Sequence, residues 1–258
     1  MRRPGHRARA GRTAVALRRL EALRQYALDH LHLVWPPVGM VRFGSLRRLA
    51  PISAARGADR GSPIDRYYIE HFLGRHAGQQ DYVLGDIKGH VLEIGDDSYT
   101  RMFGSAVTKL DILHGDSSNA QATIVADLAR ADNIPSETFD CVICTQTLLL
   151  IYDFRSAIHH LHRMLKADGI LLLTVPGISQ ICRPDADTGG DYWRFTTWSM
   201  RRLLEEHFAP ENVIVEAYGN VLSSVAFLEG IAAQELKRAE LDVRDPNYEL
   251  VVVVRARK

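Results

Sequence analysis

The sequence predicts an α/β fold, in which a doubly wound, mostly parallel sheet of seven strands carries helices on both faces. Three observations support this prediction. Apolar runs alternate with segments of helical spacing along residues 63–258, as in successive strand and helix units. The run 90–95 (HVLEIG) ends Glu-x-Gly, which is typical of a buried strand that breaks into a tight turn. Acidic residues border the following runs, and carboxylates at strand ends line the ligand crevice of an open parallel sheet.

The chain before residue 63 does not follow this alternation. Residues 1–12 are rich in Arg, Gly and Pro, and are expected to form a disordered basic tail. Residues 13–62 are expected to form a helical extension and a linker. The spacing predicts one amphipathic helix from Thr13 to Trp35, followed by a linker from Phe43 to Ser62. The helix would cover either the mouth of the site or a second subunit, as in a homodimer.

The main domain, residues 63–258, opens with Ser62-Pro63, a helix-start signal with Pro in the first helical position. Helices are expected over residues 64–75, 99–103 (one or two turns), 153–166, 197–208 and 221–236. Strands are expected near residues 90–95, 107–112, 122–126, 139–145, 170–175, 212–218 and 249–256.

Composition narrows the class of protein further. The 32 Lys and Arg nearly balance the 31 Asp and Glu, and the basic residues cluster in the tail, so no nucleic-acid or membrane partner is expected. The chain has no apolar run of 18 residues and lacks the apolar core of a secretory signal, which predicts a cytoplasmic protein. Cys141 and Cys144 would point to opposite faces of one strand, and the histidines near residue 160 lack metal-ligand spacing, so no metal is expected.

Five segments in this order resemble the class I S-adenosylmethionine-dependent methyltransferases, in particular their small-molecule, type 11-like subgroup. They are VLEIGDD (91–97), LDILH (110–114), VADL (125–128), IPSETFDCVICTQTLLLIYD (134–153) and HRMLKADGILLLTVPG (162–177). The resemblance covers about residues 60–258. It implies a Rossmann-like sheet whose last strand runs antiparallel, and S-adenosyl-L-methionine as the cofactor.

The resemblance also implies roles for the strand-end residues. Gly95 would let the cofactor approach the backbone, because glycine has no Cβ, and Glu93 would organise the turn or hold the amino group of the cofactor through water. Asp111 would accept hydrogen bonds from both ribose hydroxyls. Asp127 would accept one from the adenine amino group, with the Leu128 backbone alongside. Both aspartates could instead be ordinary strand-end caps.

Further contacts are implied around the methionine part of the cofactor. Thr145 and Gln146 would lie near it. Tyr67 or Tyr68, on the first helix of the domain, would either touch the donor or pack that helix on the sheet. Asp97 occupies a later glycine position of the family motif, Glu/Asp-x-Gly-x-Gly-x-Gly, and would border the cofactor.

A nicotinamide dehydrogenase is the nearest competing interpretation, but its fingerprint Gly-x-Gly-x-x-Gly is absent. Only Gly95 is glycine, while Asp97 and Tyr99 fill the later positions. A pyrophosphate would be repelled by Asp96 and Asp97, whereas a cationic sulfonium or ammonium would be tolerated. The same missing glycines also weaken the match to the methyltransferase motif.

After the fourth strand, members of the subgroup often carry Leu-Glu-His, and this chain has Leu148-Leu149-Leu150. The substitution favours an apolar or aromatic-bearing acceptor, or a remodelled acceptor surface, and removes the obvious general base. Arg194 could face the acceptor or, as is slightly favoured, form an internal brace with Asp191 or Asp187. The candidates for proton transfer are His71, Tyr152, Asp191, Tyr192 and Arg194.

The sequence therefore predicts a methyltransferase acting on an O or N atom of a small molecule, such as a sugar or a specialised metabolite. Alignment does most of the work in an in-line methyl transfer, so a strong base is not essential. The alternative is a methyltransferase-fold protein that does not methylate, either a cyclase-like catalyst or a non-catalytic partner subunit. A macromolecular acceptor is less favoured.

Overall fold

The computed structural model describes residues 36–37, 39–76 and 85–258, and the chain forms two compact units, Met1–Leu49 and Ala50–Lys258. The tail and the amphipathic helix expected before Pro36 lie outside the described residues. In the described part of the first unit, Gly44–Leu46 form a single 3-10 turn. No helix among the described residues is long and apolar enough to cross a membrane.

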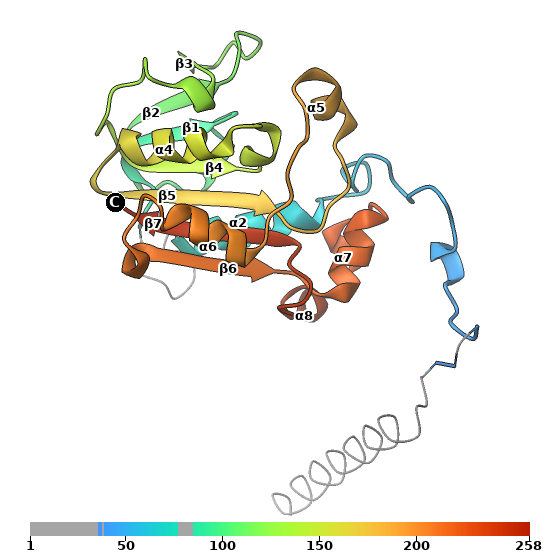
Figure 1. Ribbon diagram of the computed structural model, residues 1–258. Coiled ribbons are helices and arrows are strands. Elements are labelled where there is room, and N and C mark those ends of the chain that lie inside the picture. The colour runs from blue at the N-terminus through green and yellow to red at the C-terminus, as the bar shows by residue number, and fades with distance from the viewer. Residues whose placement is uncertain (1–35, 38, 77–84) are drawn as a thin grey trace, which may run out of the picture. The chain divides into compact units, whose positions relative to one another are not determined.

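The second unit is built on the predicted seven-stranded sheet, with strand order β3-β2-β1-β4-β5-β7-β6 (Figure 1). Its strands are β1 (Lys88–Ile94), β2 (Ala106–His114), β3 (Ile124–Val125), β4 (Phe139–Thr145), β5 (Leu165–Pro176), β6 (Val213–Tyr218) and β7 (Val251–Arg257). Only β7 runs against its neighbours β5 and β6, which confirms the antiparallel last strand. The strand order reverses between β1 and β4, and this switch point is where open α/β sheets bind ligands.

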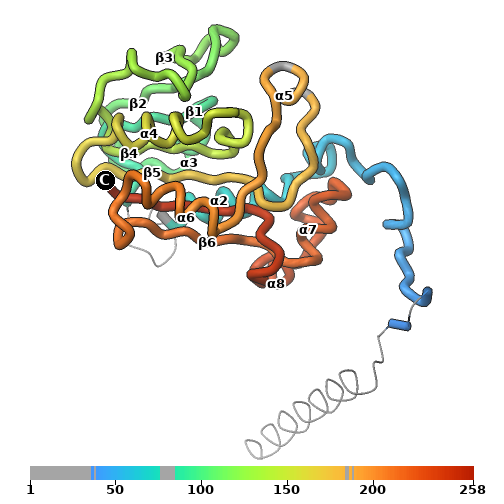
Figure 2. The backbone as a smooth tube through the Cα atoms, viewed as in Figure 1, coloured from blue at the N-terminus to red at the C-terminus, as the bar shows by residue number. Residues whose placement is uncertain are grey.

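Helices cover both faces of the sheet. They are α2 (Ile64–His76), α3 (Ser98–Phe103), α4 (Phe154–Met164), α5 (Arg183–Thr188), α6 (Thr197–Leu204), α7 (Val221–Leu228) and α8 (Arg238–Leu241). Apolar residues of α4 and α6 form one core with the sheet, and those of α2, α3 and α7 form a second core with its other face. In Figure 2, α4 and α6 accordingly lie in front of the sheet and α2 lies behind it.

Three helices are shorter than the spacing predicted, and one of them is α6, which ends at Leu204 instead of Phe208. Helix α4 ends at Met164 because the chain enters β5 directly at Leu165. Helix α7 ends at Leu228, since Gly230 takes a positive φ of 69° and a Cβ there would lie 2.2 Å from the Ser53 carbonyl oxygen. The close approach of two backbones, rather than local propensity, therefore stops α7.

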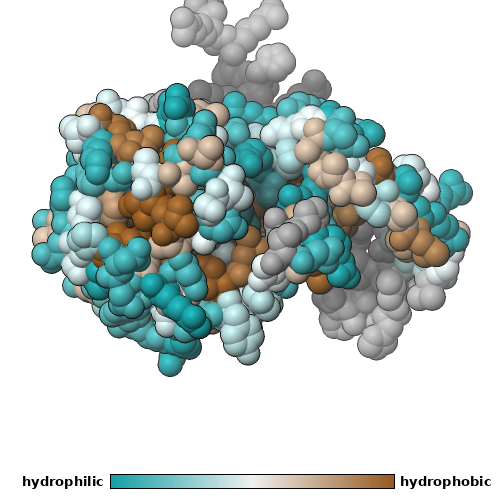
Figure 3. All heavy atoms as spheres, turned by 90° about the horizontal axis from the view of Figure 1, so that it is seen from above, coloured by the Kyte–Doolittle hydropathy of each residue, from teal (hydrophilic) through white to brown (hydrophobic). Residues whose placement is uncertain are grey.

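The segment 53–62, which the sequence suggests as part of a linker, packs on the chain that follows α7. The Ser53 amide donates to the Glu229 carbonyl oxygen at 3.0 Å. A Cβ on Gly57 would lie 3.2 Å from the backbone of Gly230 and Ile231. These contacts make the segment an integral part of the second unit. The face in Figure 3 shows apolar patches among polar residues, the ordinary surface of a folded domain.

Candidate functional site

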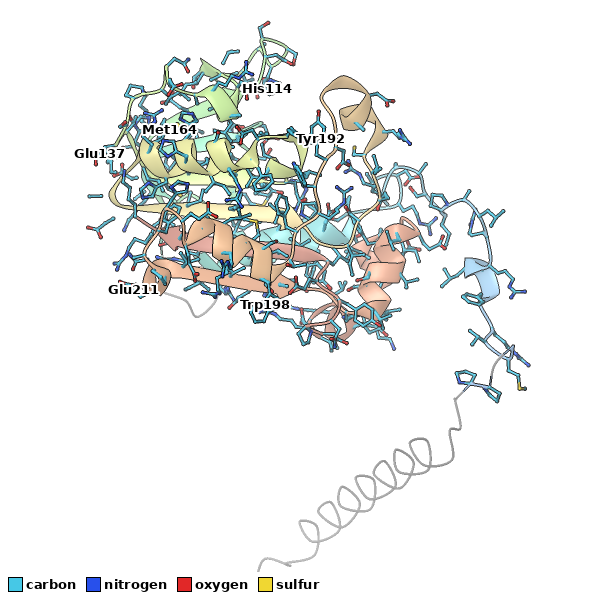
Figure 4. The ribbon with its side chains drawn as sticks, viewed as in Figure 1. His114, Glu137, Met164, Tyr192, Trp198 and Glu211 are labelled. Carbon is cyan, nitrogen blue, oxygen red and sulfur yellow. The ribbon has the colours of Figure 1, made fainter. Side chains whose placement is uncertain are left out.

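A cavity of about 400 Å³ opens at the carboxyl ends of β1, β4 and β5, at the switch point of the sheet. Residues of the segment 55–58, the first turns of α2 and the loop after β5 complete its wall. In Figure 4, His114 and Tyr192 lie toward this end of the parallel strands, and Glu137 lies at the opposite end. The cavity therefore occupies the place that the sequence predicted for a ligand.

The turn after β1 presents bare backbone to this cavity. Gly95 has a φ of +102°, and a Cβ built on it would meet nothing within 4 Å. Its amide donates to the Leu113 carbonyl oxygen at 2.9 Å, and its own carbonyl oxygen accepts from Asn119 Nδ2 at 2.7 Å. Both bonds hold the turn from the side of β2 and leave open space at Gly95, so the backbone there is accessible to a ligand.

Glu93 holds this turn in place by hydrogen bonds to the residues that follow it. Its buried carboxylate accepts the amides of Tyr99 at 3.0 Å and Thr100 at 2.7 Å, which caps the start of α3. Burial raises the pKa of Glu93, while these hydrogen bonds oppose the rise. Of the two aspartates in the turn, Asp96 lines the cavity, whereas Asp97 precedes α3 and pairs with Arg101 at 2.5 Å.

Asp111 does not reach the cavity, and the expectation that it lies at a strand end was wrong. Strand β2 continues to His114, because Ile112 and Leu113 extend its buried apolar run. The Asp111 carboxylate is held inside the protein by three side chains: His90 Nε2 at 2.6 Å, Thr123 Oγ1 at 2.8 Å and Lys109 Nζ at 2.9 Å. Burial alone would raise its pKa, but these hydrogen bonds outweigh burial and lower it.

Asp127 and Leu128 also lie away from the cavity wall. The exposed Asp127 side chain accepts the amide of Ala129 at 2.9 Å and caps the 3-10 turn Leu128–Arg130. Leu128 is buried in the core. The capping alternative is thus what the structure shows for Asp127, and contact with an adenine group stays a prediction.

Thr145 and Gln146 line the cavity where β4 ends, and their contact with the methionine part of the cofactor stays a prediction. Gln146 adopts a positive φ of 47°, its amide donates to the Thr174 carbonyl oxygen at 2.8 Å, and its Nε2 lies 3.3 Å from Thr174 Oγ1. Leu149 and Leu150 follow on the same wall, while Leu148 is fully buried in the core. Leu149 and Leu150 therefore give the cavity an apolar side beside its polar one.

Asp191 lines the cavity, but its carboxylate is already saturated. Arg194 donates to both of its oxygens, at 2.5 and 3.1 Å, and the Cys182 amide donates at 2.9 Å. The hydrogen bond from Arg194 is the main cause of the lowered pKa of Asp191. Arg194 also donates to the carbonyl oxygens of Ser179 and Gln180. It is the internal brace that the sequence slightly favoured, and it fixes the loop after β5.

The other predicted side chains lie outside the cavity wall. Tyr68 is buried, donates to the Leu241 carbonyl oxygen at 2.9 Å and stacks on Tyr218, so it packs α2 on the sheet. His71 lies beside it in a separate cavity of about 80 Å³. Tyr152 is 70 % exposed and meets Tyr192 edge to face. These four residues therefore do not lie at the site.

Sequence reasoning missed three charged residues of the cavity, Arg56, Asp65 and Arg66. Asp65 is half-buried in the first turn of α2, where it accepts the Arg66 amide at 2.8 Å, and burial raises its pKa. The Arg66 side chain donates to the Tyr99 hydroxyl and lies over its ring. The helix-start signal at Ser62-Pro63 could have indicated Asp65, but no sequence signal marks Arg56.

Comparison with known proteins gives a match over part of the chain. Residues 92–173 match the model of a family described as a methyltransferase domain. Among solved structures, a methyltransferase from Archaeoglobus fulgidus is 13 % identical, with 74 % of this chain and 98 % of that one covered and a TM-score of 0.46. The N-methyltransferase NodS from Bradyrhizobium japonicum is 14 % identical, with 76 % and 96 % covered and a TM-score of 0.43.

A methyltransferase from Mesorhizobium loti is 14 % identical, with 78 % of this chain and 100 % of that one covered and a TM-score of 0.47. No curated protein sequence matches the chain. Likenesses this remote say nothing about the reaction. Residues 92–173 of this chain therefore match a methyltransferase domain, on a sheet of the predicted order with a glycine turn after β1.

Proposed function

We propose that this protein binds S-adenosyl-L-methionine in the cavity at the switch point and transfers its methyl group to an O or N atom of a small molecule, such as a sugar or a specialised metabolite. The observation that carries the proposal is the Gly95 turn. Its backbone faces open space in a cavity of about 400 Å³, where any other residue would project a side chain.

The wall around Gly95 suits the methionine part of the donor. Thr145 and Gln146 offer polar groups beside the turn, and the carboxylates of Glu93 and Asp96 favour a ligand with positive charge. Arg66 also lines the cavity. Its Cζ lies 5.2 Å from the centroid of the Tyr99 ring, which follows the Gly95 turn. Arg66 would pair with the carboxylate of the methionine part.

The remaining wall suits an acceptor with both apolar and polar groups. Leu149 and Leu150 supply apolar surface. Gln180 also lines the cavity, and its buried Oε1 has no hydrogen-bond partner among the residues that the structure describes. A buried oxygen without a partner is costly, so it would accept a hydrogen from a hydroxyl or amino group of the acceptor.

When bound, the donor supplies a methyl group on a sulfonium, which is transferred by in-line substitution. The protein's contribution is to hold the acceptor atom in line with that methyl group and to exclude water. The braced loop 179–191 and the fixed turn at Gly95 both limit movement of the cavity wall. A rigid wall of this kind favours alignment over strong acid or base catalysis.

Calorimetric titration with S-adenosylhomocysteine tests the proposal. Wild-type protein should bind it, and Gly95→Val should abolish binding, because the new side chain would fill the space the ligand needs. Gly115→Val is the control: a Cβ built on Gly115 also meets nothing within 4 Å, and Gly115 does not line the cavity.

Thermal unfolding of each variant would show that it is folded. If folded wild-type protein binds neither S-adenosylmethionine nor S-adenosylhomocysteine, the proposal is wrong, and the alternative of a cyclase-like catalyst or partner subunit is favoured. If Gly95→Val binds as well as wild type, the donor does not occupy this turn.

A further inference from the structure

Arg56 stands out in the cavity wall because its backbone is strained. Its φ of 57° lies in the left-handed region, which costs a residue other than glycine about 1 kcal/mol or more. The conformation is imposed by the turn around it. Ser53 Oγ accepts the amides of Ala55 at 3.1 Å and Gly57 at 3.3 Å, and Gly57 is wedged against the backbone of Gly230. A fixed, strained turn therefore presents Arg56 at the cavity.

Arg56 is an exposed residue, and no ion pair within the described part of the chain accounts for this arrangement. Among the described residues, none forms a hydrogen bond or an ion pair with its side chain, although those of Arg60 and Arg194 have carboxylate partners. The Arg56 charge lowers the pKa of both Asp65 and Asp191, so it lies within electrostatic reach of each. Asp191, however, is saturated by Arg194 and the Cys182 amide.

The charges in the cavity are therefore divided between its two ends. At the Gly95 turn, where a cationic donor would bind, the two carboxylates of Glu93 and Asp96 outnumber the one guanidinium of Arg66. At the other end, near the braced loop after β5, the Asp191 charge is compensated by Arg194, and Arg56 adds a cation of its own. Asp65 reduces this positive charge less than an ordinary aspartate would, because burial disfavours its ionised form.

We propose that Arg56 is an oxyanion subsite, and that the acceptor of the methyl group carries a carboxylate or phosphate group bound there. This inference rests on the proposed function, which assigns the Gly95 end to the donor. The planar guanidinium donates two parallel hydrogen bonds to an oxyanion. Binding a charged group away from the reacting atom holds the acceptor in register for in-line transfer, while Leu149 and Leu150 contact its apolar part.

The test uses full-length protein saturated with S-adenosylhomocysteine, titrated at low ionic strength with inorganic phosphate and, separately, with malonate. Wild type should bind at least one of these probes, and Arg56→Gln should weaken that binding at least about tenfold, since it loses a charged hydrogen-bond donor. Arg60→Gln, in the same segment but paired with Glu235 outside the cavity, should bind as wild type does.

The affinity for S-adenosylhomocysteine separates this inference from the proposed function. It should be the same in wild type and Arg56→Gln, which also shows that the variant is folded. If wild type binds S-adenosylhomocysteine but neither anion, or if Arg56→Gln binds the anions equally well, the oxyanion subsite is wrong and the donor site stands. If wild type does not bind S-adenosylhomocysteine, the proposed function itself is contradicted.

Discussion

At the scale of single residues, Asp65 is the carboxyl group best placed to take a proton from the acceptor. It lines the cavity, and its hydrogen bond from the Arg66 amide leaves capacity for a second partner, unlike the saturated Asp191. Burial raises the pKa of Asp65, which brings it closer to neutral pH and makes it a better base. We propose this role because all five side chains considered from the sequence are either outside the cavity wall or engaged in fixed contacts.

Replacing Asp65 by Asn should lower kcat by about 100-fold or more, with the affinity for S-adenosylhomocysteine retained. In wild type the ionised carboxylate is the active form, so kcat should rise with pH through the raised pKa of Asp65, and this dependence should be absent in the variant. Glu70→Gln is the control, since Glu70 lies on the same helix and burial also raises its pKa, but it does not line this cavity. A pH profile equal to wild type in Asp65→Asn would exclude Asp65 as the base.

At the scale of elements, the length of β2 decides the role of Asp111. Because the strand runs on to His114, the carboxylate lies beside the middle of β1 and joins His90, Lys109 and Thr123. Asp111→Ala should therefore leave the affinity for S-adenosylhomocysteine nearly unchanged. It should lower the free energy of unfolding by about 2 to 3 kcal/mol, because buried polar partners lose their acceptor.

Urea unfolding and calorimetric titration of the same preparation would check both parts of this prediction. Asp116→Ala serves as a control, since Asp116 follows the same strand and is exposed. If a folded Asp111→Ala protein no longer binds S-adenosylhomocysteine, this prediction is wrong. Asp111 would then accept hydrogen bonds from the ribose, as the sequence resemblance implied.

At the scale of the whole molecule, a group of histidines is expected to make the stability of the fold depend on pH. His159 and His162 on α4 lie with ring centroids 5.4 and 6.0 Å from His207, so α4 contacts the chain that follows α6 through imidazole rings. Burial, followed by the charges of Lys258 and the neighbouring histidines, lowers the pKa of His162 to about 4. Burial also lowers the pKa of His160 and His207.

Acidification should therefore destabilise the protein between about pH 6.5 and pH 4. In this window the unfolded chain takes up a proton at His162 that the folded chain refuses, so the free energy of unfolding falls as pH falls. Because His162 is half-buried, we expect a loss of about 1 to 2 kcal/mol from it. Urea unfolding at pH 7 and pH 4.5 should show a smaller difference for His162→Gln than for wild type; equal differences would contradict the assignment.

The sequence by itself determined the seven strands, their order along the chain and five of the helices, whereas α5 and α8 were not predicted. Apolar periodicity located the strands, and the Glu-x-Gly turn, Thr145 and Gln146 fell at the switch point as predicted. These features are local, since a strand and the turn that ends it are encoded by consecutive residues. The same locality explains the error at Asp111, because its motif position does not reveal how far the strand continues beyond it.

Only the tertiary structure decided which side chains share the cavity. Asp191 lies far along the sequence from Arg56 and Asp65, and the three meet because the segment 53–62 packs on the chain after α7 while Arg194 braces the loop after β5. Their meeting depends on close backbone contacts at Gly57 and Gly230. No periodic sequence pattern marks such contacts, so they could not be predicted. Local sequence patterns therefore predict the fold. The charge of the site depends on the packing of segments that are distant in the sequence, which such patterns do not encode.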